Sequence, residues 1–183
     1  MTLKNGLRAL AMGTLLAVPL AAVGATPAMA ATNVVASGGQ LFVSAGFGGD
    51  DISINVEDGF LVVRNFTDAI FAGSVTCANV DPRTVRCTAT GITKMLVRTN
   101  TGADTVRNNT ALPAQAFLGP DGDLYYGGSA RDLVSGEGGN DLMDGNGGDD
   151  VLMGDDGAFD QVFGGPGADL CTAEKETACE GDA

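Results

Sequence analysis

The chain has 183 residues, and its 23 acidic side chains against 10 basic ones give a formal net charge of −13. This charge disfavours binding to nucleic acid and to anionic membranes. The sequence has no His and no Trp, which excludes Ser-His-Asp and Cys-His catalysis, histidine-ligated zinc and indole platforms for stacking sugars.

Residues 1–30 have the three parts of a secretory signal peptide. Lys4 and Arg8 make a basic start, an apolar stretch runs from Leu10 to Val23, and the small residues Ala28-Met29-Ala30 predict cleavage after Ala30. A membrane-spanning helix is the alternative, but this stretch is shorter than the ~20 apolar residues that a bilayer needs. We therefore expect a secreted, extracellular protein that does not insert into a membrane.

Residues 31–118 predict a β-rich N-terminal region. Short apolar runs at 41–43, 60–63 and 95–97 and an alternating segment at 52–56 are separated by Gly and Asp-Gly turn signals. No helix of three turns is visible, and residues 110–118 read as a short connector.

Four cysteines fit an oxidising destination. Four cysteines allow three connectivities, and we favour the two local pairs, Cys77 with Cys87 and Cys171 with Cys179. A turn signal at Asp81-Pro82 lies near the middle of the first pair, as in a disulfide-closed hairpin. Neither pair has the CxxC spacing of a redox or zinc site.

From Gly119 to Thr172 the sequence repeats with a period near nine residues, with one residue missing from the first copy and Phe159 inserted in the fifth. The sixth positions hold Asp123, Asp132, Asp141, Asp150, Asp160 and Asp169. The eighth positions hold Tyr125, Val134, Met143, Leu152, Val162 and Cys171. A disordered acidic Gly-rich tail is the alternative, but such a tail has no reason to place an apolar residue two positions after every key Asp.

This pattern resembles the glycine-rich nonapeptide of the repeats-in-toxin (RTX, hemolysin-type) calcium-binding family. The resemblance implies an all-β fold with a right-handed parallel β-roll, a form of β-solenoid, at residues 119–172, in which each repeat stacks on the second one along. The eighth-position side chains would then point into a narrow core. Weaker echoes of the repeat at 46–52 and 101–106 favour a continuation of the β-solenoid into the N-terminal region, with the disulfide-closed hairpin projecting from it; a small β-sandwich is the alternative.

The resemblance also implies Ca²⁺ as the cofactor, bound by glycine carbonyls and sixth-position carboxylates of stacked turns, an all-oxygen environment that Ca²⁺ prefers and that is too large for Mg²⁺. The implied metal-site residues are Gly127, Gly128, Asp132, Gly136, Gly139, Asp141, Gly145, Gly148, Asp150, Gly154, Gly157, Asp160, Gly164, Gly165, Gly167 and Asp169. The best sites would pair Asp132 with Asp150 and Asp150 with Asp169.

Departures from the repeat weaken other sites. Ala130, Glu137, Asn146 and Asp155 stand where the consensus has glycine. The site that would pair Asp123 with Asp141 is therefore disfavoured, and Phe159 disturbs the one that would pair Asp141 with Asp160. Asp51 and Asp104, in the two N-terminal echoes, are weaker calcium candidates, with plain turns as the alternative.

Charge bears on whether the repeats fold alone. Residues 119–172 contain 11 Asp and one Glu against Arg131, and Gly-rich backbone loses much entropy on ordering. We expect this segment to be disordered without metal and to fold when Ca²⁺ neutralises it.

Residues 173–183 follow the repeats and would form a C-terminal cap tethered by Cys171 and Cys179; an exposed staple without a capping role is the alternative. The expected function is that of a secreted calcium-binding protein, not an enzyme, used as a structural or cell-surface or matrix interaction module. The alternative is a carboxylate-based extracellular polysaccharide hydrolase or lyase on a β-solenoid.

Overall fold

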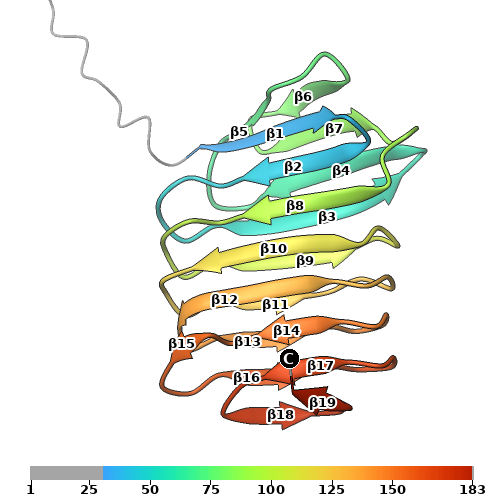
Figure 1. The fold of residues 1–183 in the computed structure, drawn as a ribbon. Helices are drawn as coiled ribbons and strands as arrows, with labels where there is room; N and C mark the ends of the chain where they lie inside the picture. The colour runs from blue at the N-terminus through green and yellow to red at the C-terminus, as the bar shows by residue number, and fades with distance from the viewer. Residues whose placement is uncertain (1–30, 183) are drawn as a thin grey trace, which may run out of the picture.

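The computed structural model describes residues 31–182, so the predicted signal peptide at 1–30 lies outside the described residues. The described residues form strands, turns and bends without any helix, and none of them belongs to a helix that could span a bilayer. Two sheets run along the molecule, one behind the other, from the N-terminal strands to the C-terminus (Figure 1). The all-β expectation is confirmed.

Each sheet contains both parallel and antiparallel strand pairs. The ten-stranded sheet consists of β1 (Thr32–Ser37), β2 (Gln40–Ser44), β5 (Ile70–Ala72), β8 (Lys94–Arg98), β10 (Ala114–Gly119), β12 (Leu133–Gly139), β14 (Val151–Met153), β15 (Asp156–Gly157), β17 (Leu170–Thr172) and β19 (Gly181–Asp182). The nine-stranded sheet consists of β3 (Asp51–Glu57), β4 (Phe60–Asn65), β6 (Cys77–Asp81), β7 (Thr84–Thr88), β9 (Thr105–Asn109), β11 (Leu124–Tyr126), β13 (Leu142–Asp144), β16 (Gln161–Phe163) and β18 (Lys175–Thr177).

In the repeats, strands two nonapeptides apart pair in parallel. Leu133 of β12 lies opposite Val151 of β14, and Leu124 of β11 lies opposite Leu142 of β13. The insertion at Phe159 lengthens the next step by one residue, because Leu142 pairs with Gln161. Successive repeats therefore lie in different sheets, and each repeat lies against the second one along.

The N-terminal region belongs to the same two sheets. Strand β2 pairs in parallel with β8, and β3 pairs in parallel with β9, while antiparallel hairpins fill the chain between them. Two expectations are wrong here. Residues 114–119 form strand β10 rather than a connector, and the β6–β7 hairpin does not project, because β7 pairs with β4 over five residues and extends the sheet.

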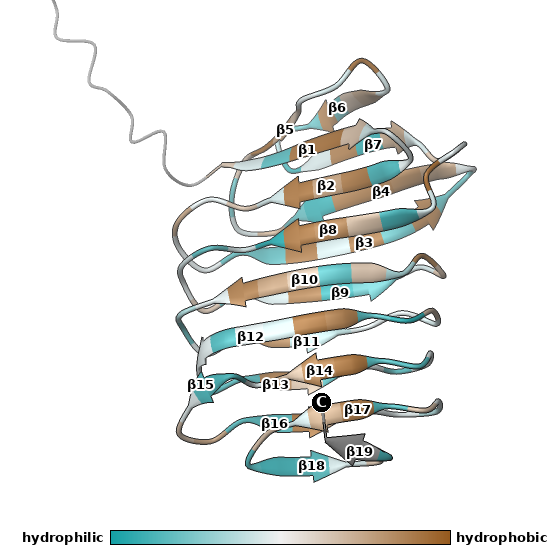
Figure 2. Cartoon of the chain, viewed as in Figure 1, coloured by the Kyte–Doolittle hydropathy of each residue, from teal (hydrophilic) through white to brown (hydrophobic). Residues whose placement is uncertain are grey.

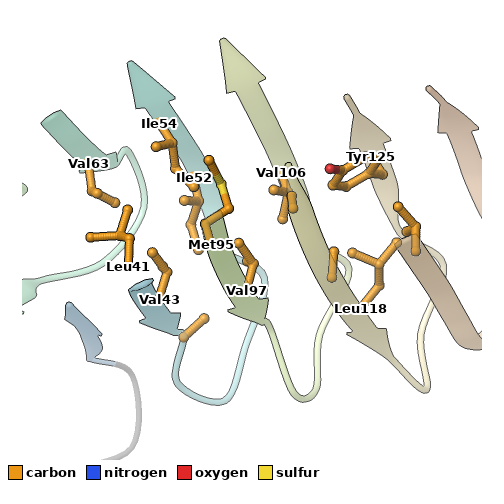
Figure 3. Packing of buried hydrophobic residues seen from close by; sticks show 14 of the residues in the cluster. Leu41, Val43, Ile52, Ile54, Val63, Met95, Val97, Val106, Leu118 and Tyr125 are labelled. Carbon is orange, nitrogen blue, oxygen red and sulfur yellow. The ribbon is translucent and has the colours of Figure 1, made fainter. Parts of the chain in front are cut away.

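The hydrophobic core lies between the sheets, as Figure 3 shows for its N-terminal half. Each short repeat strand buries one side chain, and all six of the expected eighth-position residues from Tyr125 to Cys171 are fully buried. The N-terminal strands bury more, for example Ile52 and Ile54 of β3 and Leu61 and Val63 of β4. Hydrophobic residues accordingly dominate β1 and β2 in Figure 2, while β18 is hydrophilic. The expected core pattern is confirmed.

Both local disulfides are formed, Cys77 with Cys87 and Cys171 with Cys179. Cys77 and Cys87 lie directly opposite each other on β6 and β7. Two disulfides are typical of proteins that fold in an oxidising, extracellular environment. After Cys171 the chain adds β18 and β19 to the ends of the two sheets, so the tail extends the strand stack.

Candidate functional site

The buried aspartates of residues 31–182 fall into two rows. Every one of these residues immediately precedes a strand and is at most 2 % exposed. The five-Asp row, in the nine-stranded sheet, consists of Asp50, Asp104, Asp123, Asp141 and Asp160. The three-Asp row, in the ten-stranded sheet, consists of Asp132, Asp150 and Asp169. All six sixth-position aspartates of the repeats thus lie inside the protein, at the turns that lead into the strands.

Backbone hydrogen bonds connect the members of each row. The N–H of Asp123 donates to Oδ1 of Asp141 at 2.8 Å, and the N–H of Asp132 donates to Oδ1 of Asp150 at 2.7 Å. The pattern repeats along both rows, with Asp50 to Asp104, Asp104 to Asp123, Asp141 to Asp160, and Asp150 to Asp169. One oxygen of each accepting carboxylate is therefore committed to holding two neighbouring turns together.

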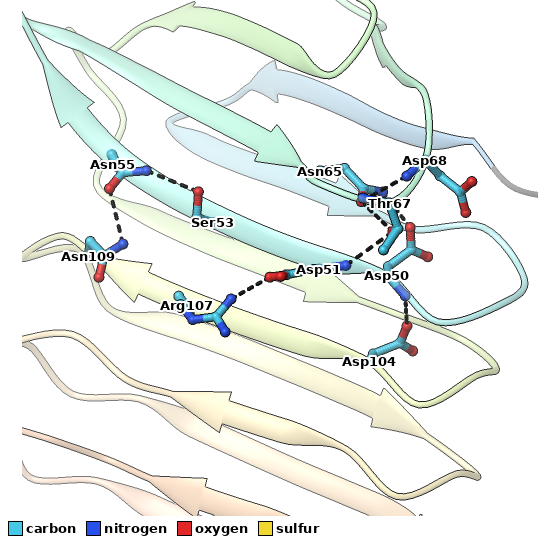
Figure 4. Close-up of polar contacts among 10 residues, drawn as sticks. All are labelled: Asp50, Asp51, Ser53, Asn55, Asn65, Thr67, Asp68, Asp104, Arg107 and Asn109. Atoms are coloured by element: carbon cyan, nitrogen blue, oxygen red, sulfur yellow. Dashed lines mark hydrogen bonds and ion pairs between the residues drawn. The ribbon is translucent and has the colours of Figure 1, made fainter.

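The ends of the rows have different partners. Figure 4 shows the N-terminal end, where the side-chain amide of Asn65 donates to Oδ1 of Asp50. The same amide also donates to the hydroxyl of Thr32 at 2.9 Å. At the C-terminal end, Glu174 and Glu180 each use Oε2 to accept the N–H of Asp160 and of Asp169, at 2.8 and 2.5 Å. The two glutamates of the tail take the place that a further Asp would have.

The second carboxylate oxygens have no such partner. Within residues 31–182, Oδ2 is buried without a hydrogen-bond partner in Asp50, Asp104, Asp123, Asp141, Asp150 and Asp169. A buried carboxylate oxygen without a donor is strongly destabilising unless a cation or a proton compensates it. These oxygens are therefore the atoms that need an explanation.

Glycines leave space beside three of these oxygens. A Cβ atom on Gly145 would lie 2.6 Å from the carbonyl oxygen of Gly164 and nearer still to Oδ2 of Asp150. Gly136 has the same relation to Gly154 O and Asp141 Oδ2, and Gly164 has it to Ala178 O and Asp169 Oδ2. We call these three places the oxygen-lined gaps. At each of them a carboxylate oxygen and a backbone carbonyl oxygen approach the same glycine, and both are ligands of the kind that Ca²⁺ accepts.

Asp132 differs from the other repeat aspartates. Its Oδ2 accepts hydrogen bonds from the Tyr125 hydroxyl at 2.9 Å and from the Gly128 N–H at 3.1 Å. Both of its oxygens are thus used, because Oδ1 accepts the N–H of Ala114 at 2.8 Å. Asp132, which the sequence places in one of the two best sites, therefore has donors from the protein at both oxygens, although burial still raises its pKa.

Side chains fill the corresponding places in the N-terminal half. Leu118 takes the register position of Gly136, because its neighbours Phe117 and Gly119 lie opposite Ser135 and Glu137. Thr99 lies next to it, and its hydroxyl donates to the carbonyl oxygen of Leu118. The oxygen-lined gaps are therefore a feature of the repeats.

Asp51 does not join the five-Asp row. Figure 4 shows that it forms an ion pair with Arg107 on the outer face of the sheet, while Asp50 is the buried member of the row. The sequence signal for Asp50 is the buried Ile52 two residues later, which has the same spacing as the sixth and eighth positions of the repeats. Glu174 and Glu180 have no repeat signal and were missed. Tyr125 was expected as a core residue, but the bond from its hydroxyl to Asp132 was missed.

The remaining glycines of the predicted site shape the turns. Gly139, Gly148, Gly165 and Gly167 have positive φ, and so do Glu137, Asn146 and Asp155, three residues that replace consensus glycines. These substitutions therefore keep the left-handed backbone of the turn at a modest energetic cost. Gly127 and Gly128 lie beside Asp132, and Gly154 and Gly157 lie beside Asp160.

Burial makes the negative charge of the rows unfavourable. It raises the pKa of Asp104 and of Asp141 to about 7, and the pKa of Asp123 and of Asp150 to about 6, with a further contribution from neighbouring acids of the chain. A proton or a cation would remove this penalty.

Comparison with other proteins adds no relative. No protein-family model, curated protein or solved structure that was compared with this chain matches it. Among residues 31–182 no group of three or more His, Cys, Asp or Glu side chains comes together as a metal cluster. A cation in the oxygen-lined gaps would therefore need backbone carbonyls together with single carboxylates.

Proposed function

We propose that this protein is a secreted calcium-binding protein of RTX type, whose residues 119–172 form a right-handed parallel β-roll that Ca²⁺ completes. The observation that carries the proposal is the unpartnered, buried Oδ2 of Asp141, Asp150 and Asp169, each beside a glycine and a backbone carbonyl oxygen. The parallel pairing of strands two nonapeptides apart supports the β-roll.

The donor set favours Ca²⁺ over other ions. The polar atoms nearest to the oxygen-lined gaps are carboxylate and carbonyl oxygens, which suit a hard cation and include none of the nitrogen or sulfur ligands that zinc and copper prefer. Mg²⁺ requires a smaller, near-octahedral site and keeps several waters. Asp141, Asp150 and Asp169 would hold the ion, with the carbonyls of Gly154, Gly164 and Ala178.

The ion would supply positive charge where the protein has none. Residues 119–172 carry 12 acidic side chains and one arginine, and the buried carboxylates repel one another. Neutralisation by Ca²⁺ would stabilise the stacked turns, so that the metal has a structural role. This role fits a protein that serves as a structural or interaction module.

The alternative function, a polysaccharide hydrolase or lyase, has less support. A carboxylate acid–base pair must reach its substrate, and the aspartates of both rows are almost completely buried. Their oxygens already hold neighbouring turns together. The two disulfides support the secreted location.

The test is calorimetric titration of residues 31–183 with Ca²⁺ and, separately, with Mg²⁺, followed in parallel by far-ultraviolet circular dichroism. We expect affinities for Ca²⁺ on the order of 10⁻⁴ to 10⁻³ M, as for extracellular modules, and a gain of β signal with Ca²⁺ only. Absence of both binding and a spectral change would show that the repeats are an acidic spacer.

A pair of neighbouring variants localises the ion. Asp150→Asn keeps the acceptor for the Asp132 N–H and replaces the unpartnered oxygen with an amide, so it should lower calcium binding. Asp149→Asn removes the same charge from an exposed side chain whose Oδ1 only accepts the Ala168 N–H at 3.0 Å. Equal losses in the two variants would point to diffuse attraction of Ca²⁺ to acidic charge instead of a site.

A further inference from the structure

The N-terminal end of the molecule presents a strand edge whose single charged residue is Asp81. Strand β6 is the last strand of the nine-stranded sheet, and its side away from β7 has no strand partner within the described chain. Figure 1 shows β6 at the end of the stack opposite to the C-terminus. No charged residue occurs between Ala69 and Val80.

The neighbouring edge, β5, is closed by the protein itself. The Asn79 side chain donates to the carbonyl of Ile70 at 2.6 Å and accepts the N–H of Ala72 at 3.0 Å, and the N–H of Ile70 donates to Pro82 O. These groups face away from β1, the partner of β5. The Asn79 amide therefore replaces a neighbouring strand for β5, and β6 is left as the open edge at this end.

Apolar side chains accompany the open edge. Val80 on β6 is 61 % exposed, and Val75, in the connection between β5 and β6, is completely exposed. Soluble proteins usually protect an edge strand with charged residues, proline or a covering segment. The 69–80 segment has no charge and no proline, and the Cys77–Cys87 disulfide holds β6 in an extended, paired conformation.

We propose that β6 is the interface of a two-fold symmetric dimer, in which the β6 strands of two copies of this chain pair antiparallel. The distribution of charge favours a second copy of this chain as the partner of β6. Residues 119–172 are strongly acidic and lie toward the other end of the stack, so a two-fold contact at β6 keeps the two acidic ends far apart. Such a contact is self-complementary and closes without forming a fibre. It does not depend on the proposed calcium binding.

The test is sedimentation velocity of residues 31–183 over a concentration series, with Ca²⁺ and with a chelator. We expect a concentration-dependent dimer that Val80→Lys converts to a monomer. Val56→Lys is the matched control, because Val56 is also more than half exposed, at 54 %, but lies on β3. A monomer at every concentration, or equal dissociation by both substitutions, overturns the proposal.

Amide hydrogen exchange gives a second readout that does not rely on a substitution. Exchange across Cys77–Asp81 should slow as the protein concentration rises, because pairing of the two edges protects the outward N–H groups. Exchange in β8, which lies inside its sheet, should not change. Slowing in other exposed segments without any in β6 would place the contact elsewhere and overturn the proposal.

Discussion

The hydroxyl of Tyr125 donates a hydrogen bond of 2.9 Å to Oδ2 of Asp132, and both side chains are fully buried. Burial, together with the Asp132 charge, raises the pKa of the Tyr125 hydroxyl well above its usual value, so the phenol stays a donor. Tyr125 thus does for Asp132 what we propose that Ca²⁺ does for Asp141, Asp150 and Asp169. Both carboxylate oxygens of Asp132, the first member of the three-Asp row, thus have hydrogen-bond donors from the protein.

The Tyr125→Phe variant tests this compensation. It leaves Oδ2 of Asp132 with the Gly128 N–H as its remaining donor. We expect the free energy of unfolding, measured with saturating Ca²⁺, to fall by about 1–3 kcal/mol. Tyr126→Phe is the control, because Tyr126 lies on the outer face, near Arg107. An unchanged stability in Tyr125→Phe would contradict the role assigned to the hydroxyl.

The oxygen-lined gaps are tested by adding a methyl group. At Gly145 it would meet Asp150 Oδ2 and Gly164 O, whereas at Gly147 the nearest atoms are 3.9 Å away. Neither glycine has a positive φ, so alanine suits the backbone at both. Calorimetry should show that Gly145→Ala loses about one equivalent of bound Ca²⁺ while Gly147→Ala keeps it. An equal stoichiometry in the two variants would show that Ca²⁺ does not bind at the gap beside Gly145.

Stability without metal should depend on pH in a direction opposite to that of most proteins. In the folded chain the pKa of Asp104 and of Asp141 is about 7, above the ~3.9 of an unfolded Asp. The folded state therefore binds more protons in this range, so stability is highest at low pH and is lost as the pH rises through about 7. Denaturant titrations with a chelator, from about pH 4 to pH 8, measure the slope.

Calcium should reverse this trend. Ca²⁺ binds the deprotonated carboxylates and competes with protons, so its affinity should weaken on acidification. Repeating the same titrations with saturating Ca²⁺ should therefore give a stability that falls toward low pH. A metal-free stability that increases with pH would show that the buried aspartates stay charged with other partners.

The tail disulfide should stabilise the C-terminal end locally. Cys171 lies in the core and Cys179 holds the tail that carries Glu174 and Glu180. Replacing both cysteines by Ala should lower the free energy of unfolding by about 2 kcal/mol or more. In this variant the rate of amide hydrogen exchange should increase in β18 and β19 but not in β2. Uniformly faster exchange along the chain would show instead that the tail is part of one cooperative unit.

Much of the repeat region could be predicted from the period of nine residues. The period places an Asp before each strand and an apolar residue inside it, and both were found where expected. The N-terminal members of the five-Asp row were harder to predict. In Gly48-Gly49-Asp50-Asp51 either Asp could match the repeat, and the choice depends on which neighbour enters the core. Ile52 does, so Asp50 is inside and Asp51 meets Arg107 at the surface.

Other features depend on contacts between distant residues, which no local pattern contains. Strand β10 looks like a connector because Pro113 precedes it, yet pairing with β8 and β12 on its two sides makes it a central strand. Glu174 and Glu180 lie outside the period, and only the stacking of the tail brings them to the ends of the rows. The Tyr125 hydroxyl finds Asp132 because their turns are adjacent in space.

The rows of aspartates also limit how the length of this protein can change in evolution. From Asp104 onward, the bonds between neighbouring aspartates of a row join residues that are 18 or 19 positions apart. Duplication or deletion of two adjacent nonapeptides would add or remove one layer and leave every other bond intact. A single nonapeptide would send all later strands, and the final glutamates with them, to the opposite sheet, so lengths that differ by an even number of repeats should be the ones that survive.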